Sequence, residues 1–304
     1  MCPAQAILVS HETLDKSDVS GLFYITKQQG LEIQREIGNR NGEATPLRNL
    51  GLAYCSLGQY DRAIGFYQQS LEIQREIGNR NGEANSLSDL GLAYYSLGQY
   101  QRAIDFYQQS LEIQREIGNR NGEANSLVRL GLAYYLLGQY DRAVDFHQQA
   151  LEIARAIDDR GYEAISLGNL GNAYYSLGQY QRAIDFYQQS LEIQREIGNR
   201  NDEAKCLFTL SNIYQQRGQF KRASSYRHQM YRIWQELDLP LEALPFSDFQ
   251  KRLLRNLGDD WIEQMIENER KLAWFLEQLG LILFSIRWLF SPIRWHQKRL
   301  KPRK

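Results

Sequence analysis

Apolar residues recur every three or four positions in blocks that repeat along most of the chain. In residues 81–120 the first apolar stripe consists of Leu87, Leu90, Ala93, Tyr94 and Leu97. This spacing places the stripe on one face of an α-helix. Gly98 interrupts the pattern, and a second stripe runs from Tyr100 to Ile117, before Gly118. Each block is therefore expected to form two helices joined by a tight turn, with Gly118 in a left-handed conformation after the second.

The residues after Gly118 predict the start of the following helix. Asn121 is expected to cap it, with Glu123 in its first turn, where the helix dipole favours a negative charge. Pro46 of the preceding block is expected in a first turn as well, because proline loses no hydrogen bond there.

The blocks are close copies of one another, and most positions of 41–80 recur unchanged in 81–120. The decapeptide LEIQREIGNR occurs at 31–40, 71–80, 111–120 and 191–200, with a drifted copy at 151–160. We predict an irregular segment at 1–20, a repeat array at 21–240 and a helical extension at 241–304. The array is divided into a half repeat at 21–40, repeats at 41–80, 81–120, 121–160 and 161–200, and a degenerate repeat at 201–240.

A single helix pair of this size cannot bury its own apolar faces, whereas stacked pairs share a continuous core. Gly91, Ala93 and Ala103 allow close backbone approach, and the rings of Tyr94, Tyr100 and Tyr107 are expected to fill the space around them. The predicted fold is all-α, a right-handed superhelical solenoid of stacked antiparallel helix pairs.

The spacing of these residues resembles the tetratricopeptide repeat (TPR). The matching positions in the second copy are Leu87, Leu90, Gly91, Tyr94, Gly98, Tyr100, Ala103 and Tyr107. His147 replaces the last tyrosine in the third copy, and the fifth copy departs from the pattern at Ser211, Arg227 and Met230. The 40-residue length is similar to the repeats of kinesin light chains and the Pins/LGN adaptors. This resemblance implies a binding groove lined by the first helix of each pair, and a partner that is a protein or peptide.

The first helices also differ between copies, for example at the position of Asn49, Asp89, Arg129, Asn169 and Thr209. Positions that pack on a repeating neighbour must repeat, whereas positions that face a non-repeating ligand need not. Drift at exposed positions is the alternative. The candidate peptide-binding residues are Arg48, Asn49, Asp89, Tyr95, Arg129, Tyr135, Asn169, Asn172, Tyr175 and Asn212. The alternative roles are partial core for the tyrosines and solvated or inter-helix polar contacts for the asparagines.

Composition excludes several other functions. The chain carries 36 basic and 36 acidic residues, so it lacks the basic excess typical of a nucleic-acid-binding domain. The three cysteines and four histidines are scattered, which argues against a disulfide framework or a metal site. Glu72, Glu76, Glu112 and Glu116, beside Arg75 and Arg115, are expected on a solvated face, and His147 in the core. We expect no enzyme activity and no cofactor.

The segment 241–304 differs in composition, with 12 basic and 8 acidic residues and four of the five tryptophans. An apolar helix is expected to end near residue 290, before a basic tail. Candidate membrane-interface residues are Trp274, Phe284, Arg287, Trp288, Arg294, Trp295, Lys298 and Arg299. Three possibilities remain open for 272–304: interfacial anchoring, a cap on the solenoid or partner contact, and a marginal transmembrane helix.

These patterns predict a non-enzymatic interaction scaffold that binds a peptide or helix and is recruited to an anionic membrane by its C-terminal segment. The alternative is a structural or self-associating protein whose C-terminal helix caps the array. No secretory signal is apparent near the N-terminus, so a cytoplasmic location is expected.

Overall fold

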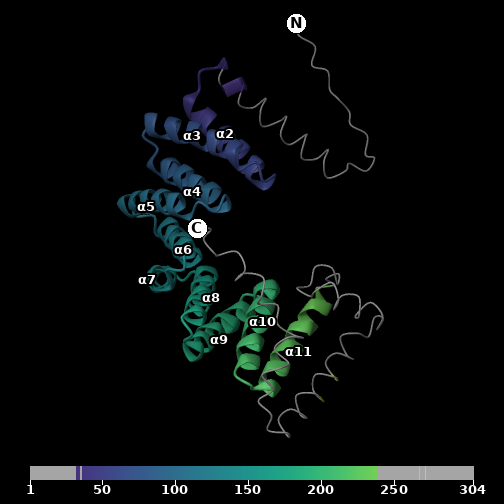
Figure 1. The fold of residues 1–304 in the computed structure, drawn as a ribbon. Helices are drawn as coiled ribbons and strands as arrows, with labels where there is room; N and C mark the ends of the chain where they lie inside the picture. The colour runs from purple at the N-terminus through teal and green to yellow at the C-terminus, as the bar shows by residue number, and fades with distance from the viewer. Residues whose placement is uncertain (1–31, 35, 238–266, 268–270, 272–304) are drawn as a thin grey trace, which may run out of the picture. The chain divides into compact units, whose positions relative to one another are not determined.

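The computed structural model describes residues 32–34, 36–237, 267 and 271 (Figure 1). The chain divides into two compact units, residues 1–158 and 159–304. The described part of the first unit contains α2 (Arg40–Ser56), α3 (Tyr60–Glu76), α4 (Arg80–Ser96), α5 (Tyr100–Glu116), α6 (Arg120–Leu136) and α7 (Tyr140–Ala156). The described part of the second contains α8 (Arg160–Ser176), α9 (Tyr180–Glu196), α10 (Arg200–Gln216) and α11 (Phe220–Glu236).

Consecutive helices pack in pairs within each unit, and no strand occurs in the described ranges. In the first unit, α2, α4 and α6 lie on one side, and α3, α5 and α7 on the other (Figure 1). The expected all-α architecture of stacked helix pairs is confirmed. We call α2, α4, α6, α8 and α10 the first helices and their partners the second helices.

Helix boundaries follow from a glycine and an asparagine that recur together. Gly118 has a φ of 68°, which confirms the expected left-handed position after α5. The cap of α6 is Asn119 rather than Asn121, because its side chain accepts a hydrogen bond from the backbone N–H of Gly122 at 3.1 Å. The helix therefore starts two residues earlier than expected. Pro46 lies inside α2, beyond the first turn, so that expectation was also wrong.

In the first four described pairs, a ring on the second helix occupies the space beside a glycine on the first helix. A Cβ atom added to Gly91 would lie 2.5 Å from Cε1 of Tyr107, and one added to Gly131 would lie 2.4 Å from Cε1 of His147. Real Cβ contacts are not this short, so any larger residue at either position would displace the ring. Tyr107 and His147 are both 1% exposed, and the expected core position of His147 is confirmed.

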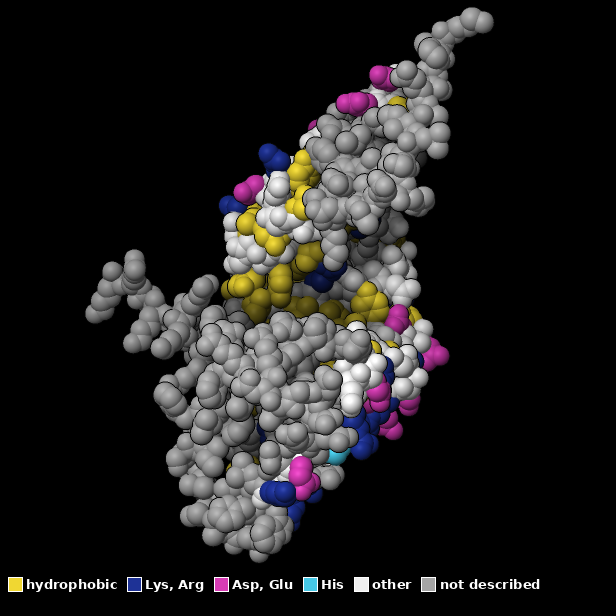
Figure 2. All heavy atoms as spheres, turned by 90° about the vertical axis from the view of Figure 1, so that its right-hand side faces the viewer, with side chains coloured by type: hydrophobic (Ala, Val, Ile, Leu, Met, Phe, Trp, Pro, Cys, Tyr) yellow, Lys and Arg dark blue, Asp and Glu magenta, His cyan; other side chains and the backbone are white. Residues whose placement is uncertain are grey.

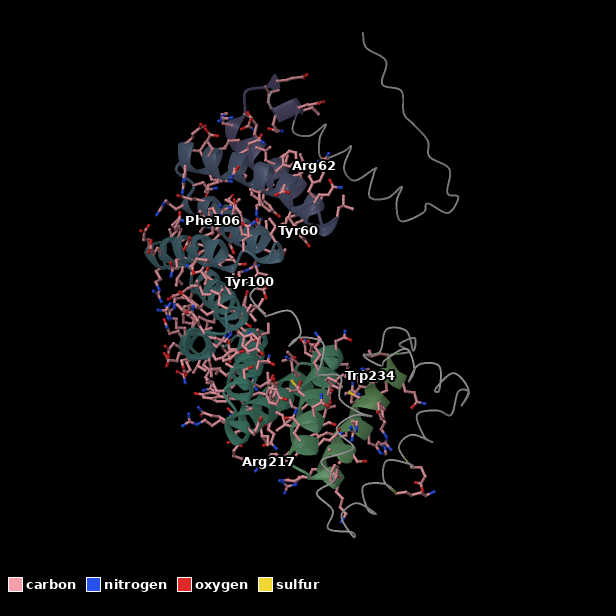
Figure 3. All side chains as sticks on the ribbon, viewed as in Figure 1. Tyr60, Arg62, Tyr100, Phe106, Arg217 and Trp234 are labelled. Atoms are coloured by element: carbon pink, nitrogen blue, oxygen red, sulfur yellow. The ribbon has the colours of Figure 1, made fainter. Side chains whose placement is uncertain are left out.

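A second recurring contact joins the two helices of a pair through stacked aromatic rings. Tyr94 on α4 stacks on Phe106 on α5, with ring centroids 5.3 Å apart and an angle of 4° between planes (Figure 3). The guanidinium carbon of Arg102 lies 5.5 Å from the Tyr94 ring centroid, on the second helix of the same pair. Equivalent Tyr–Phe or Tyr–Tyr stacks with an arginine occur in all five described pairs.

Buried glutamates join one pair to the next. Glu83 on α4 is 7% exposed, and its carboxylate accepts from Arg75 of the preceding pair at 2.8 Å and from Arg80 at 2.5 Å. Arg80 also pairs with Glu116. Glu76 and Glu116 are exposed as expected, but Arg75 and Arg115 reach the next pair instead of pairing with acids on their own helix.

Small polar side chains complete the boundary between pairs. The Ser110 hydroxyl donates to the Ala84 carbonyl at 2.9 Å and lies 3.3 Å from the Ser126 hydroxyl of the following pair. Gln114 packs on the first turn of α6, where a Cβ at Gly122 would lie 2.3 Å from its Cδ atom. The same serine, glutamine and glycine occur at the boundary between α3 and α4.

Substitution of Gly91 and Gly65 by alanine should have opposite effects. Gly91→Ala forces the Tyr107 ring to move, at a cost of about 1–3 kcal/mol, so the thermal midpoint should fall. Nothing lies within 4 Å of a Cβ at Gly65, inside α3. Gly65→Ala should therefore raise the free energy of unfolding by roughly 0.5–1 kcal/mol, because alanine has the higher helix propensity, and the midpoint should rise with it. Circular dichroism melts of the two variants test this. Equal midpoints for the two variants would contradict the close contact between Gly91 and the Tyr107 ring.

The pH dependence of stability should carry a contribution from His147. Burial lowers the pKa of His147 to about 4, and its Nδ1 atom has no hydrogen-bond partner in the described structure. The unfolded chain takes up this proton below about pH 6.5, whereas the folded chain does so only near pH 4. Stability should therefore fall by up to about 3 kcal/mol as the pH drops through this window.

His147→Tyr restores the residue of the neighbouring repeats and serves as the comparison. Thermal midpoints measured from pH 7 to pH 4 should fall more steeply for the wild-type chain than for this variant. Parallel curves would show that His147 does not titrate in this way.

Candidate protein-binding face

The first-helix face consists of the side chains at positions 48, 49, 52 and 55 and at the equivalent positions of the later copies. These positions lie three or four apart along the helix or next to one another, so they share one side of each first helix. The residue at each of these four positions differs between copies. Figure 2 views the molecule from the side on which α2, α4 and α6 lie, and hydrophobic side chains gather there with basic ones among them.

A charged cluster spans three successive first helices in the unit 1–158. The Nε atom of Arg48 on α2 donates to Oδ2 of Asp89 on α4 at 2.5 Å. The Asp89 side chain is only 7% exposed, whereas that of Arg48 is 37% exposed. Burial raises the pKa of the Asp89 carboxyl, and the opposing effects of Arg48 and Arg129 are smaller. The structure thus brings together two candidate residues that are 41 positions apart.

Arg129 on α6 adds a second cation to this cluster. Its guanidinium carbon lies 5.9 Å from the Tyr107 ring centroid, and its Nε atom donates to Asn125 at 2.6 Å. The charge of Arg129 acts on Asp89, and burial raises the pKa of Tyr107 to about 12. With two arginines and one carboxylate, the cluster carries a net positive charge on the first-helix face.

The tyrosines of this face are half-buried and contact a tyrosine at the start of the second helix. The rings of Tyr95 and Tyr100 lie 5.6 Å apart at 66° (Figure 3), and Tyr135 contacts Tyr140 at 5.4 Å. Burial raises the pKa of Tyr95. Each tyrosine therefore contributes to packing and keeps part of its surface exposed.

The unit 159–304 carries amides in place of the charged cluster. Oδ1 of Asn172 accepts a hydrogen bond from the hydroxyl of Tyr187 on α9 at 2.5 Å, which favours the inter-helix role for this asparagine. Tyr175 on α8 accepts from Gln216 on α10 at 2.7 Å. Asn169 and Asn212 are half-buried, as is Asn49 in the other unit.

The sequence did not predict which residues of the first-helix face contact one another. The Arg48–Asp89 pair joins different copies, and helical periodicity within one copy does not reveal such contacts. The opposite charges of Arg48 and Asp89 are the one signal in the sequence that could have suggested this pair.

Metal binding and membrane crossing have no support in the described ranges. No group of three or more histidine, cysteine, aspartate or glutamate residues there could hold a metal ion. No helix among those described is long and apolar enough to cross a bilayer. The membrane-interface candidates at 274–299 lie outside the described residues.

The tetratricopeptide-repeat family model matches the chain in overlapping segments at 28–76, 42–116, 82–156, 122–196 and 162–236. The chain belongs to the tetratricopeptide-repeat family. Arrays of this family generally act as non-enzymatic scaffolds for protein interactions, and the repeats of this chain fit that role. No curated protein sequence is significantly similar to it.

Solved structures of the same fold include proteins related to kinesin light chain, as the repeat length suggested. BtubC (BKLC) from P. vanneervenii has a TM-score of 0.66 and 20% identity, over 72% of this chain and 92% of that one. The nearly identical TPR-like repeats of a putative kinesin light chain from Podosopora anserina have a TM-score of 0.54 and 24% identity, over 64% and 96%. A Rap protein in complex with Competence and Sporulation Factor has a TM-score of 0.57 and 16% identity, over 88% and 80%.

The ion pair between Arg48 and Asp89 should stabilise the first unit. Arg48→Met leaves a buried carboxylate unpaired and should cost about 1–3 kcal/mol. Adding Asp89→Asn, the residue found at the equivalent positions 49 and 169, should recover most of the loss. Thermal denaturation measures both changes.

Lys205→Met is the matched control, because the pair Lys205–Asp202 is exposed at 77% and 33% and should contribute little. Equal losses in Arg48→Met and Lys205→Met would contradict the buried character of the first pair.

Proposed function

We propose that this chain is a scaffold that binds a peptide or helix of a protein partner on its first-helix face. The observation that carries the proposal is the contrast between repeating and non-repeating positions. The packing glycines and the stacked rings within pairs recur in successive copies, whereas the first-helix face changes from Asp89 to Arg129 to Asn169. A surface that packing constrains less than the core, carrying cations, amides and tyrosines, suits a ligand that does not repeat.

The chemistry of the face favours a ligand with both acidic and amphipathic parts. Arg48 and Arg129 offer guanidinium donors to a carboxylate, while Tyr95 and Tyr135 offer partly exposed rings. In the unit 159–304, Asn169 offers an amide to the backbone of an extended segment. The Rap protein solved with Competence and Sporulation Factor supports a ligand-binding role for the fold, at the level of the fold alone.

Peptides selected on the full-length protein from a random display library provide the test. We expect Arg129→Ala or Asn169→Ala to weaken binding of a selected peptide at least ten-fold, because each removes a donor from the face. Gln108→Ala, on the exposed surface of α5, should leave the affinity unchanged. Circular dichroism verifies that each variant is folded.

Asn172→Ala alone is a poor probe, because it also removes the partner of the Tyr187 hydroxyl. Comparison of Asn172→Ala with Tyr187→Phe separates a loss of ligand contact from a loss of packing. Selected peptides that bind all face variants as tightly as the wild type would rule out this face.

We further propose that residues 272–304 recruit the chain to an anionic membrane surface. The support is sequence alone: after Glu277 the chain has no acidic residue and seven basic ones, and two of the tryptophans, Trp288 and Trp295, lie among them. Recruitment should be electrostatic, and therefore sensitive to salt.

Sedimentation with phosphatidylcholine vesicles, with and without phosphatidylserine, measures this recruitment. The wild-type chain should co-sediment with the anionic vesicles only, and the variant Arg294→Glu, Lys298→Glu, Arg299→Glu should lose this binding. Binding that is unaffected by the three substitutions would refute a role for the basic tail.

A further inference from the structure

The second-helix side chain that packs beside the first-helix glycine ends in a polar group, and this group reaches the first-helix face. In the fourth pair, the Tyr187 hydroxyl donates to Asn172 at 2.5 Å. In the fifth pair, Arg227 at the same position donates to Gln215 at 2.7 Å. Asn172 and Gln215 are the equivalents of positions 52 and 55 of the face. The polar ends of these second-helix side chains therefore lie beneath the first-helix face.

The corresponding hydroxyl of the first pair, that of Tyr67 on α3, lacks such a partner. The Tyr67 side chain is 0% exposed, and its oxygen has no hydrogen-bond partner among the described residues. Leu52, which offers no acceptor, stands where the fourth pair has Asn172. A buried hydroxyl without a hydrogen bond costs free energy, so a ligand group that binds Tyr67 removes a penalty that the free chain carries.

The residues around the Tyr67 hydroxyl define which group suits it. The Cys55 thiol lies beside it, and the charges of Asp89 and Arg48 act on it. Burial raises the pKa of Tyr67 and the Asp89 charge raises it further, so the hydroxyl stays protonated and is able to donate. The Asp89 carboxylate accepts from Arg48 at 2.5 Å, and a carboxylate accepts more than one hydrogen bond. The site therefore combines a neutral donor with a negatively charged acceptor.

A small residue stands at the face position next to this hydroxyl. Position 55 holds Cys55 in the first copy, and Tyr95, Tyr135 and Tyr175 in the next three. Cys55 is half-buried. The exchange of a ring for a thiol removes most of the side chain at this position, and rotation about χ1 alone displaces the sulfur. Access to the hydroxyl thus requires the movement of one atom.

We propose that Tyr67 and Asp89 form a subsite for an amide group of the ligand, an inference that rests on the binding face proposed above. The Tyr67 hydroxyl donates to the amide oxygen, and the Asp89 carboxylate accepts from the amide N–H. An amide supplies both groups without charge, whereas a ligand carboxylate would be repelled by Asp89. The amide belongs to the main chain or to an asparagine or glutamine side chain. Arg129, on the next first helix, suits a carboxylate instead.

Tyr67→Phe in the full-length chain tests the subsite, with peptides selected from the random display library as the probe. The variant should bind a selected peptide about five-fold more weakly, as expected for the loss of one hydrogen bond. Its thermal midpoint should not fall, because the hydroxyl has no partner in the free chain. Tyr187→Phe is the matched control and should lower the midpoint, because it removes a hydroxyl that is bound to Asn172.

A second variant tests access to the hydroxyl. Cys55→Tyr restores the residue of the following copies, so it should leave the chain folded. Its ring should cover the Tyr67 hydroxyl and weaken binding of the same peptides to a similar extent. Wild-type affinity in this variant would contradict the role of the small residue.

Changes in the peptide identify the source of the amide. Replacement of each asparagine or glutamine by aspartate or glutamate tests the side-chain source, and replacement of each main-chain amide by an ester tests the main-chain source. One of these changes should weaken binding to the wild-type chain about five-fold. The loss should shrink in Asp89→Asn, because the new side-chain amide is able to donate and carries no charge.

Unchanged affinity of every selected peptide for Tyr67→Phe would overturn the subsite and would mean that solvent satisfies the hydroxyl. If Arg129→Ala still weakens the same peptides, the proposed face stands without the subsite. If neither variant changes the affinity, or no peptide binds, both proposals fail. A midpoint of Tyr67→Phe that falls as far as that of Tyr187→Phe would assign Tyr67 a structural role. That result would overturn the subsite as well, as would a loss of binding to Tyr67→Phe that depends only on a peptide carboxylate.

Discussion

The close approach of a ring to a glycine determines how the two helices of each pair are placed. A Cβ at Gly51, Gly91 or Gly131 would overlap a ring on the partner helix, so glycine is required wherever that ring is present. The fifth pair shows the converse, because Ser211 replaces the glycine where Arg227 replaces the ring. Arg227 donates to Gln215 of α10 at 2.7 Å, so its head group turns to the side chain of another residue. This coupled exchange indicates that the two positions act as one contact.

Contacts between neighbouring pairs impose a second constraint. Glu83, Glu123 and Glu203 are each buried and bound by two arginines, one from the preceding pair. Removing the partner of a buried carboxylate would lower the free energy of unfolding by about 3–5 kcal/mol. These positions therefore repeat, whereas the first-helix face changes from copy to copy. The packing permits this variation, and we propose that the variation reflects the binding of a ligand.

Much of the fold could be predicted because it depends on local patterns. The stripe from Leu87 to Leu97, the turn at Gly98 and the core position of His147 all follow from helical periodicity and alignment of the copies. The cap was misplaced because the sequence Asn119-Arg120-Asn121 offers two chemically identical asparagines, and only the backbone distinguishes them. The partners of the candidate site residues could not be predicted in the same way. Arg48 meets Asp89, and Asn172 meets Tyr187, across helices whose relative rotation is set by tertiary packing.

The central claim is that variation on the first helices reflects binding, and a contact map of a bound peptide tests it most directly. A selected peptide that carries a photo-crosslinking residue would be bound to the full-length chain, and the cross-linked residues identified by mass spectrometry. The account predicts cross-links to the first helices, at or beside Arg48, Tyr95 and Arg129 in the first unit, or at or beside Asn169 in the second. Cross-links confined to exposed residues of the second helices, such as Gln108 and Glu112, would contradict it.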